Sequence, residues 1–337
     1  MANRSSATSG NWRADDADTW GLGIGNYPAA GDLVTILNGH DVTLVEDNLA
    51  GAVVINSGGT ITGGGNKLTL NDAAGTTYIF SNVGTISGNL DIDITGGSAD
   101  RPINEAGTGS IRNLTINNAQ TYRTHYHLSL SGNLTITSGT LTTNNGSSDM
   151  NLTVAGDTQI TGGTLTCNAS TINLRSGGSG NTWGLRLNSG TFNGGTGTHN
   201  IGGLRVQGGT FVWSNGTTTL NGAESSSSAS TLYKTSSGTF TVGTGTVVVD
   251  TSSTLQWLLY GGDVSVYNLT IASGSTLKLW QNTADGTAAR LLTVAGDLTV
   301  TGGFNTKFGS QDDVNVTVTG EVSIAGTLTG NASAITI

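Results

Sequence analysis

The chain has 337 residues, a formal net charge of −9 and 10% charged residues, so it lacks the basic surface that nucleic-acid binding requires. It contains 53 glycines and 2 prolines, and hydrophobic residues make up 35% of it. Because those hydrophobic residues recur in register, low-complexity disorder is excluded. The single cysteine, Cys167, excludes an internal disulfide, and we expect it to be a small buried hydrophobic residue.

Residues 1–50 differ from the rest of the chain and are predicted to form an N-terminal capping segment. The start, MANRSSATSG, has no apolar core of a secretory signal, and no run approaches the ~18 apolar residues of a membrane span. The stretch 10–48 contains Trp12 and Trp20. Both are large enough to plug the apolar cross-section and unpaired strand edges that the first coil of a repeat protein exposes.

From residue 51 to 337, glycines interrupt a short apolar alternation. The segment LTVAGDTQITGGTLT (152–166) returns as LTVAGDLTVTGGFNT (292–306), with looser copies at 128–142 and 316–329. Alternation with period two, broken by Gly, Asn or Asp, is typical of short strands joined by tight turns. In the two close copies, Leu152, Val154, Leu292 and Val294 are predicted to lie in the core.

The repeat length predicts the fold. A Gly followed by Thr and an apolar residue recurs about every 25 residues from Gly59 to Gly326, a period that is typical of a solenoid built only from strands and turns. The strict hexapeptide of left-handed β-helices is absent. We therefore predict a right-handed parallel β-helix of roughly eleven irregular coils over residues 51–337. A β-propeller is the alternative, and strands this short disfavour its four-stranded blades.

A second repeat predicts which residues stack and which face outward. STINLR (170–175), STLYKT (230–235), STLQWL (253–258) and STLKLW (275–280) align without gaps. The alignment predicts an inward stack formed by Ile172, Leu232, Leu255 and Leu277.

Large side chains then face outward from neighbouring coils, with Leu258 beside Trp280. Such a patch on a soluble rod usually marks an interface. We predict a partner interface formed by Tyr233, Leu258, Tyr260 and Trp280. Two alternatives stay open: the segment 216–230 folds over these side chains, or they stack on a sugar ring.

Two pairs of polar residues were considered for chemistry. Asp91 and Asp93 face outward from one strand at a separation that suits an inverting glycosidase, but a solvated acidic face is the favoured interpretation. His125 and His127 share an outward face without a third metal ligand of suitable spacing. The sequence therefore predicts no enzyme, no metal site and no cofactor.

Two resemblances complete the interpretation. Residues 10–48 resemble the glycine-eight type module that begins many β-helical surface proteins, and only a capping role is carried over from it. The residues that carry this resemblance are Gly10, Asn11, Trp12, Thr19, Trp20, Pro28, Gly31, Asp32, Val34, Ile36, Gly39, Val42 and Leu44.

The chain as a whole resembles β-helical structural proteins of bacteriophages, of the spike, fibre or head-decoration kind. The resemblance implies a virion protein assembled in the bacterial cytoplasm and exposed on the particle. Its partners would be other virion proteins or sister subunits, including a homotrimer, or a glycan of the host surface. The alternatives are a tailspike-type polysaccharide depolymerase and a host-surface adhesin. No nucleic-acid partner and no membrane insertion are expected.

Overall fold

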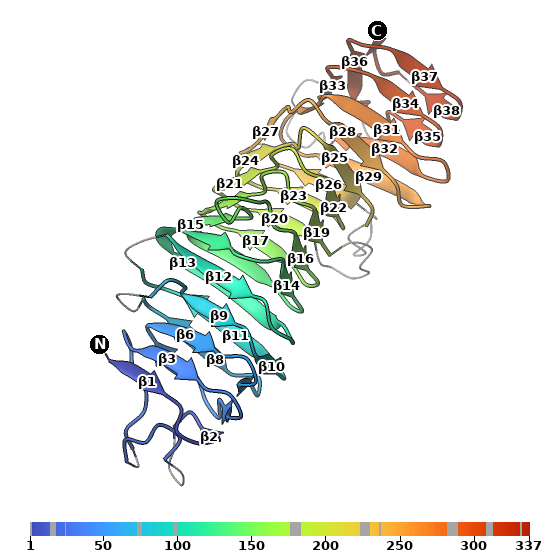
Figure 1. The fold of residues 1–337 in the computed structure, drawn as a ribbon. Helices are drawn as coiled ribbons and strands as arrows, with labels where there is room; N and C mark the ends of the chain where they lie inside the picture. Colours follow the sequence, from blue (N-terminus) through green and yellow to red (C-terminus); the bar gives the residue numbers. More distant parts are fainter. Residues whose placement is uncertain are drawn as a thin grey trace. The chain divides into compact units, whose positions relative to one another are not determined.

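The computed structural model describes residues 2–13, 18–23, 25–72, 76–97, 100–175, 183–222, 230–235, 237–281, 289–307, 313–330 and 332–337. All regular elements in these ranges are β-strands (Figure 1). The chain divides into two compact units, Met1–Gly156 and Asp157–Ile337. In both units, strands follow one another in a cycle of three, and each strand pairs with the strand one coil further along the chain. We call the three resulting series ladders 1, 2 and 3, in chain order within a coil.

In unit 1, the pairing within each ladder is parallel. Ladder 1 contains β1 (Asn3–Ser5), β3 (Leu33–Ile36), β6 (Ala52–Ile55), β9 (Phe80–Asn82), β12 (Arg101–Glu105) and the second halves of β13 (Ile111–Thr124) and β15 (Leu134–Thr142). Ladder 2 contains β2 (Gly10–Asn11), β4 (Asp41–Thr43), β7 (Thr60–Thr62) and β10 (Thr85–Ser87), then the pair β14 (Leu128–Leu130) and β16 (Leu152–Val154). Ladder 3 contains β5 (Asn48–Ala50), β8 (Lys67–Leu70), β11 (Leu90–Ile94) and the first halves of β13 and β15.

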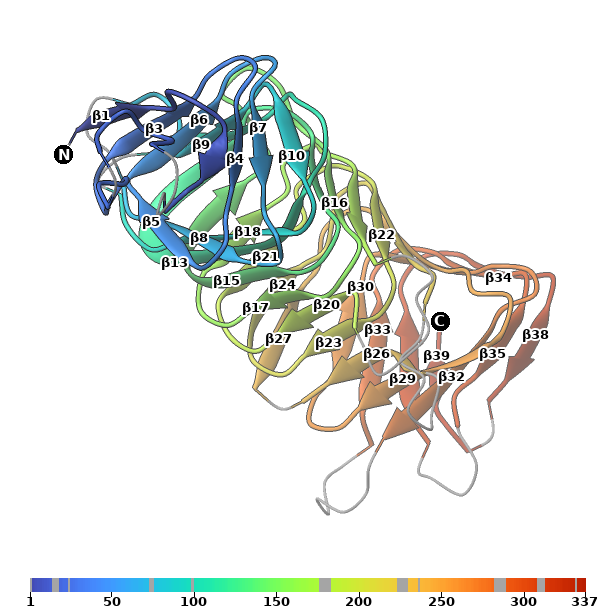
Figure 2. The same cartoon turned by 90° about the horizontal axis from the view of Figure 1, so that it is seen from below.

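Unit 2 repeats this arrangement, again with parallel pairing (Figure 2). Ladder 1 contains β18 (Thr164–Thr166), β21 (Thr191–Asn193), β24 (Gly209–Val212) and β27 (Gly238–Thr241), then β30 (Val264–Val266), β33 (Leu291–Val294), β36 (Asn315–Val318) and β39 (Ile335–Thr336). Ladder 2 contains β19 (Ile172–Leu174), β22 (His199–Ile201), β25 (Thr217–Leu220), β28 (Thr246–Val249), β31 (Asn268–Ile271), β34 (Leu298–Val300) and β37 (Val322–Ile324). Ladder 3 contains β17 (Thr158–Ile160), β20 (Leu185–Leu187), β23 (Leu204–Val206), β26 (Ser230–Lys234), β29 (Thr254–Leu259), β32 (Thr276–Gln281), β35 (Gly303–Asn305) and β38 (Thr327–Thr329).

Each unit is therefore a parallel β-helix, and the predicted fold class is confirmed. Coil length varies, since Leu185 pairs with Leu204, 19 residues on, and Leu204 pairs with Leu232, 28 residues on. Ladder 3 has five strands in unit 1 and eight in unit 2, hence thirteen rather than about eleven among the described residues. The difference arises because the first coil, β3 to β5, already lies within residues 33–50.

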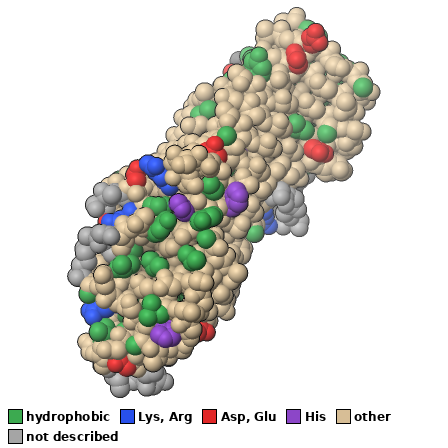
Figure 3. All heavy atoms as spheres, viewed as in Figure 1, with side chains coloured by type: hydrophobic (Ala, Val, Ile, Leu, Met, Phe, Trp, Pro, Cys, Tyr) green, Lys and Arg blue, Asp and Glu red, His purple; other side chains and the backbone are tan. Residues whose placement is uncertain are grey.

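The interior of the coils is apolar, as the alternation predicts. Leu152, Leu292 and Val294 are fully buried, and Val154 is 1% exposed. Cys167 is also fully buried, and burial raises the pKa of its thiol, so it behaves as the expected small core residue. Figure 3 shows the other side of this pattern: one face of the molecule carries mostly uncharged polar groups with scattered charges.

The predicted inward stack is correct for only part of its length. Leu255 pairs with Leu277 as expected. Leu232 instead pairs with Trp257, because the register shifts between Ser230 and Leu232 in the manner of a β-bulge. Ile172 does not belong to this stack, since β19 lies in ladder 2 and Ile172 pairs there with His199.

The repeated Gly–Asp and Gly–Asn pairs connect one coil to the next. The backbone N–H of Asp297 donates to Asn268 Oδ1 at 2.8 Å, and that of Glu321 donates to Asp297 Oδ1 at 2.9 Å. A Cβ on Gly296 would lie 2.3 Å from Asn268 Oδ1, and one on Gly320 would lie 2.4 Å from Asp297 Oδ1. The glycine therefore makes room for the side chain that accepts the next coil's hydrogen bond.

The two close copies of the repeat occupy different sides of the coil. The copy at 152–166 runs through β16, β17 and β18, in ladders 2, 3 and 1. The copy at 292–306 runs through β33, β34 and β35, in ladders 1, 2 and 3. One sequence motif thus serves different corners, because each corner needs the same inward apolar pair and the same glycine.

Ladder 1 of unit 2 is interrupted. Strands β18 to β27 belong to one sheet, whereas β30 to β39 form a separate four-stranded sheet. At the interruption, Trp213 stacks on Phe240 with ring centroids 5.4 Å apart, and its indole Nε1–H donates to the carbonyl oxygen of Ser265 in β30 at 3.0 Å. An aromatic side chain here spans from the coil of β24 to that of β30.

The two predicted capping residues lie together at the first coil of unit 1. Trp12 is fully buried, Trp20 is 4% exposed, and their rings meet edge to face at 5.2 Å. The Trp20 indole donates to the Trp12 carbonyl at 2.7 Å, and the Trp12 N–H donates to the carbonyl of Thr43 in β4. Their burial against β4 is compatible with the cap, which remains a prediction.

Replacing a core leucine should cost far more stability than trimming an outward threonine. We expect Leu152→Ala and Leu292→Ala each to lower the free energy of unfolding by ~2–5 kcal/mol, because each leaves a cavity between coils. Thr293→Ser, on the outward side of the same strand as Leu292, should cost well under half of that. Urea denaturation measures the three values, and similar losses at all three positions would contradict the observed in/out register.

Candidate functional site: a polar groove and an aromatic row

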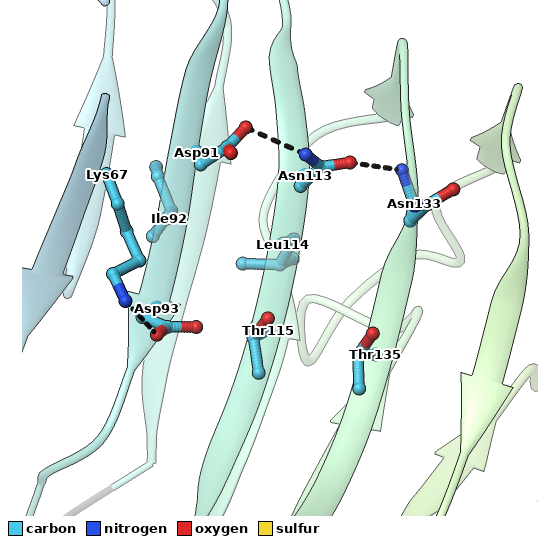
Figure 4. Close-up of a pocket in the computed structure, with 9 residues that line it drawn as sticks. All are labelled: Lys67, Asp91, Ile92, Asp93, Asn113, Leu114, Thr115, Asn133 and Thr135. Carbon is cyan, nitrogen blue, oxygen red and sulfur yellow. Dashed lines mark hydrogen bonds and ion pairs between the residues drawn. The ribbon is translucent and has the colours of Figure 1, made fainter. Parts of the chain in front are cut away.

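A polar groove lies on the outer face of ladder 3 in unit 1. It has a volume of about 340 Å³. The residues that line it come from four neighbouring coils and are Lys67, Asp91, Ile92, Asp93, Asn113, Leu114, Thr115, Asn133 and Thr135 (Figure 4). Ile92 and Leu114 point into the core, where each is 1% exposed, so the groove surface is made by the polar members.

One wall of the groove is a fixed chain of hydrogen bonds. Arg112 grips Asp91 with two bonds, Nε to Oδ1 at 2.7 Å and an Nη2 bond to Oδ2 at 2.6 Å. Asn113 Nδ2 donates to Asp91 Oδ1 at 2.9 Å, and Asn113 Oδ1 accepts the backbone N–H of Asn133 at 2.7 Å (Figure 4). Each of these residues is one coil further along, so the wall is held by the same stacking that builds the fold.

The chemistry of Asp91 follows from this chain. Partial burial raises the pKa of Asp91, but hydrogen bonds from Arg112 and Asn113 outweigh it, and the pKa lies below its ordinary value. Asp93, the next outward residue, forms an ion pair with Lys67 at 3.3 Å. An inverting glycosidase needs one carboxyl group that stays protonated. Asp91 is held ionised, so this geometry does not favour the acid pair as catalytic.

A second feature, the aromatic row, lies on the outer face of ladder 3 in unit 2. It consists of Tyr233, Tyr260 and Trp280, together with Arg205 and Leu258. The Tyr260 ring lies 5.1 Å from that of Tyr233 and 5.1 Å from that of Trp280, and the Arg205 guanidinium lies 5.0 Å above the Tyr233 ring. Figure 2 shows the strands β23, β26, β29 and β32 that carry the row side by side.

The register of the row agrees with the sequence at one step and corrects it at another. Leu258 pairs with Trp280, as predicted. Leu258 was expected to be exposed but is only 5% exposed. The bulge in β26 is the reason we see: it sets Tyr233, not a smaller residue, beside Leu258, so large side chains flank the leucine on both sides. The three rings and Arg205 are half-buried and reach the surface. The segment 216–230, considered as a cover, falls largely outside the described residues.

The two histidines do not form a metal site. The His125 ring packs edge to face against Tyr78 and Tyr126, at 5.3 and 5.2 Å. His127 Nδ1 accepts the backbone N–H of Asn151 at 2.8 Å. Among the described residues, no three His, Cys, Asp or Glu side chains come close enough together to hold a metal ion.

Two buried ionisable groups escaped the sequence analysis. His199 is fully buried in ladder 2 against Phe192, 5.7 Å between ring centroids, and burial lowers its pKa to about 4. Glu105 pairs with Asn82 in ladder 1, and burial raises its pKa to about 8, with the Asn82 hydrogen bond opposing part of the rise. Both occupy inward positions that apolar residues fill in neighbouring coils, and no local motif marks them.

No protein-family model, curated protein or solved structure matches this chain. The strand pairing alone therefore supports the β-helix, and the resemblances to the glycine-eight type module and to bacteriophage proteins stay predictions. In the described part of the chain, no helix has the length and apolar character needed to span a membrane.

Removing the guanidinium should release Asp91. In Arg112→Gln, the pKa of Asp91 should rise, because the bidentate pair that favours the ionised form is lost. Since Asp91 contributes stability above its unfolded pKa and loses it as pH falls, the variant should lose about 1 kcal/mol at pH 7 and less at pH 3. Carboxyl NMR titration and urea denaturation at the two pH values measure this. An unchanged Asp91 titration would contradict the assignment.

His199 should make the protein less stable in acid. Its folded pKa of about 4 lies below the unfolded value of 6.5, so the unfolded chain binds a proton that the folded chain refuses. Stability should therefore fall by about 3 kcal/mol as pH drops from 6.5 through 4. His199→Phe should remove this slope in denaturation curves measured across the window.

Glu105 provides the control because its sign is opposite. Its folded pKa is raised, so its contribution is complete below pH 4.5 and is lost as pH rises through about 8. Glu105→Gln should flatten that upper slope and leave the acid slope of His199 in place. Equal effects of both variants on the acid slope would refute the assignment.

Proposed function

We propose that this protein is a structural subunit of a bacteriophage virion, exposed on the particle as a decoration, fibre or spike protein. The observation that carries the proposal is the aromatic row on the outer face of unit 2. Tyr, Trp and Arg are the residues most enriched at the energetic centres of protein interfaces. Here they stand on adjacent coils of a rigid β-helix in a chain with only 6% aromatic residues.

The row supports attachment to a protein partner, either a sister subunit or another virion protein. Each ring offers an apolar body and a polar tip, so it can be buried without leaving a polar group unpaired. Tyr260 contacts the rings on both sides of it, which fixes the row before binding and reduces the entropy cost of association. The β-helix supplies the stiffness that an exposed particle component needs.

A tailspike-type depolymerase is the alternative function, and its best candidate acid pair is disfavoured by the bonds of Asp91 and Asp93 described above. A host-surface adhesin is the second alternative, and it shares the outward groove. Particle location separates these functions from the leading one: a virion subunit is present on purified particles in a fixed copy number.

The interface can be tested on purified particles that lack the protein. We expect Tyr260→Ala and Trp280→Ala each to weaken rebinding roughly 30-fold, because truncating a central aromatic residue costs about 2 kcal/mol or more. Leu258 is buried and should be left intact. Tyr267→Ala is the matched control, because Tyr267 is 38% exposed and lies outside the row. Absence of the protein from particles by antibody-gold imaging would overturn the proposal.

A further inference from the structure

We infer that the polar groove of unit 1 binds a neutral hexose unit of a glycan. The inference rests on the proposed function only in that a protein exposed on a particle meets host glycans. It concerns a different unit from the aromatic row, so each can fail without the other. The argument uses the hollow, its charge balance and its hydrogen-bonding groups.

The hollow exists because small outward residues face a wall of longer ones. In register along ladder 3, Asp93 pairs with Thr115 and Thr115 pairs with Thr135. Two residues earlier on the same strands stand Asp91 and Asn113, locked by Arg112 (Figure 4). The volume of about 340 Å³ lies at the low end of the range for small-ligand pockets and suits a single small ring.

The charges around the groove balance. Arg112 neutralises Asp91 at 2.6 Å, and Lys67 neutralises Asp93 at 3.3 Å. An anionic or cationic ligand would leave one charge without compensation when it displaced water, which is costly. A neutral polyhydroxylated ligand keeps both pairs intact. This argues against a charged sugar.

The free hydrogen-bonding capacity matches vicinal hydroxyls. An ammonium group has three donors and a carboxylate has about four acceptor sites, so the Lys67–Asp93 pair uses only part of what it offers. Side by side, the two groups can donate to one hydroxyl oxygen and accept from the next. The Thr115 and Thr135 side chains add hydroxyls and methyl groups along the floor. The Asp91–Asn113–Asn133 chain fixes the opposite wall, so the site is formed before the ligand arrives.

The same geometry favours binding over cleavage. Asp91 is ionised and gripped by a planar guanidinium, so it cannot donate the proton that a leaving sugar oxygen needs. Asp93 is ion-paired as well. A site of this size without an aromatic platform binds weakly, and many copies on one particle would provide avidity.

Titration of the full-length protein with D-glucose, D-galactose, D-mannose and N-acetylglucosamine, read by saturation-transfer NMR, tests the inference. We expect at least one of these sugars to bind. Asp93→Asn should weaken that binding about tenfold because it removes an ionised acceptor. Thr115→Tyr should abolish it by filling the hollow. Thr299→Tyr, the same change at an outward position of β34 in unit 2, is the matched control and should bind normally.

The outcomes separate the hypotheses. No binding of any of the four sugars, or unchanged binding in both Asp93→Asn and Thr115→Tyr, overturns the inference. If Thr115→Tyr fails to fold in urea denaturation, Asp93→Asn decides. Release of reducing ends from host polysaccharide would also overturn it, in favour of a depolymerase. Thr115→Tyr should still attach to particles, whereas Trp280→Ala should lose attachment and keep the sugar, so the two proposals fail separately.

Discussion

Everything in this structure depends on one constraint: each coil must lie on the previous one in register, with its backbone N–H and C=O groups paired to the neighbouring coil. Unpaired backbone groups in an apolar interior are expensive, so the strands tolerate little variation. The corners carry the variation instead, which lets one coil close in 19 residues and another in 28. The hydrogen bond from the Glu321 N–H to Asp297 Oδ1 extends the same pairing into a corner.

Because the interior is occupied by stacking, recognition is left to the outward residues. The two candidate surfaces use this freedom in different ways. In unit 1, ion pairs and amides from successive coils build a polar hollow. In unit 2, rings from successive coils build an aromatic row. Both draw one or two residues from each coil, so each surface is assembled across long sequence separations and inherits the rigidity of the ladders.

Much of the fold could be predicted from the sequence because stacking repeats locally. Alternation around Leu152 and Leu292, with glycine at the corner, identifies strands, core and coil period. Which side of the coil a motif occupies could not be predicted, since the corners have the same requirements. The one-residue bulge near Ser230 also has no local signal, and it moved Leu232 onto Trp257.

The candidate sites were less predictable, for a related reason. The outward direction of Asp91 and Trp280 follows from alternation, but the state of each side chain depends on the adjacent coils. Arg112, which grips Asp91, is 21 residues away, and the shielding of Leu258 needs the neighbouring coils in register. His199 and Glu105 occupy inward positions by exception, so a pattern that predicts apolar cores misses them.

The interruption of ladder 1 in unit 2 has a mechanical consequence. At the coil where β27 and β30 belong to separate sheets, ladders 2 and 3 continue through β28–β31 and β29–β32. A bending load on unit 2 is therefore carried by two rows of hydrogen bonds at that level and three elsewhere. On the third side, the stack of Trp213 on Phe240 and one indole hydrogen bond to Ser265 take the place of a row. Aromatic contacts slide at little cost while strand hydrogen bonds break abruptly, so this coil is where the unit flexes first, opening on the side of ladder 1.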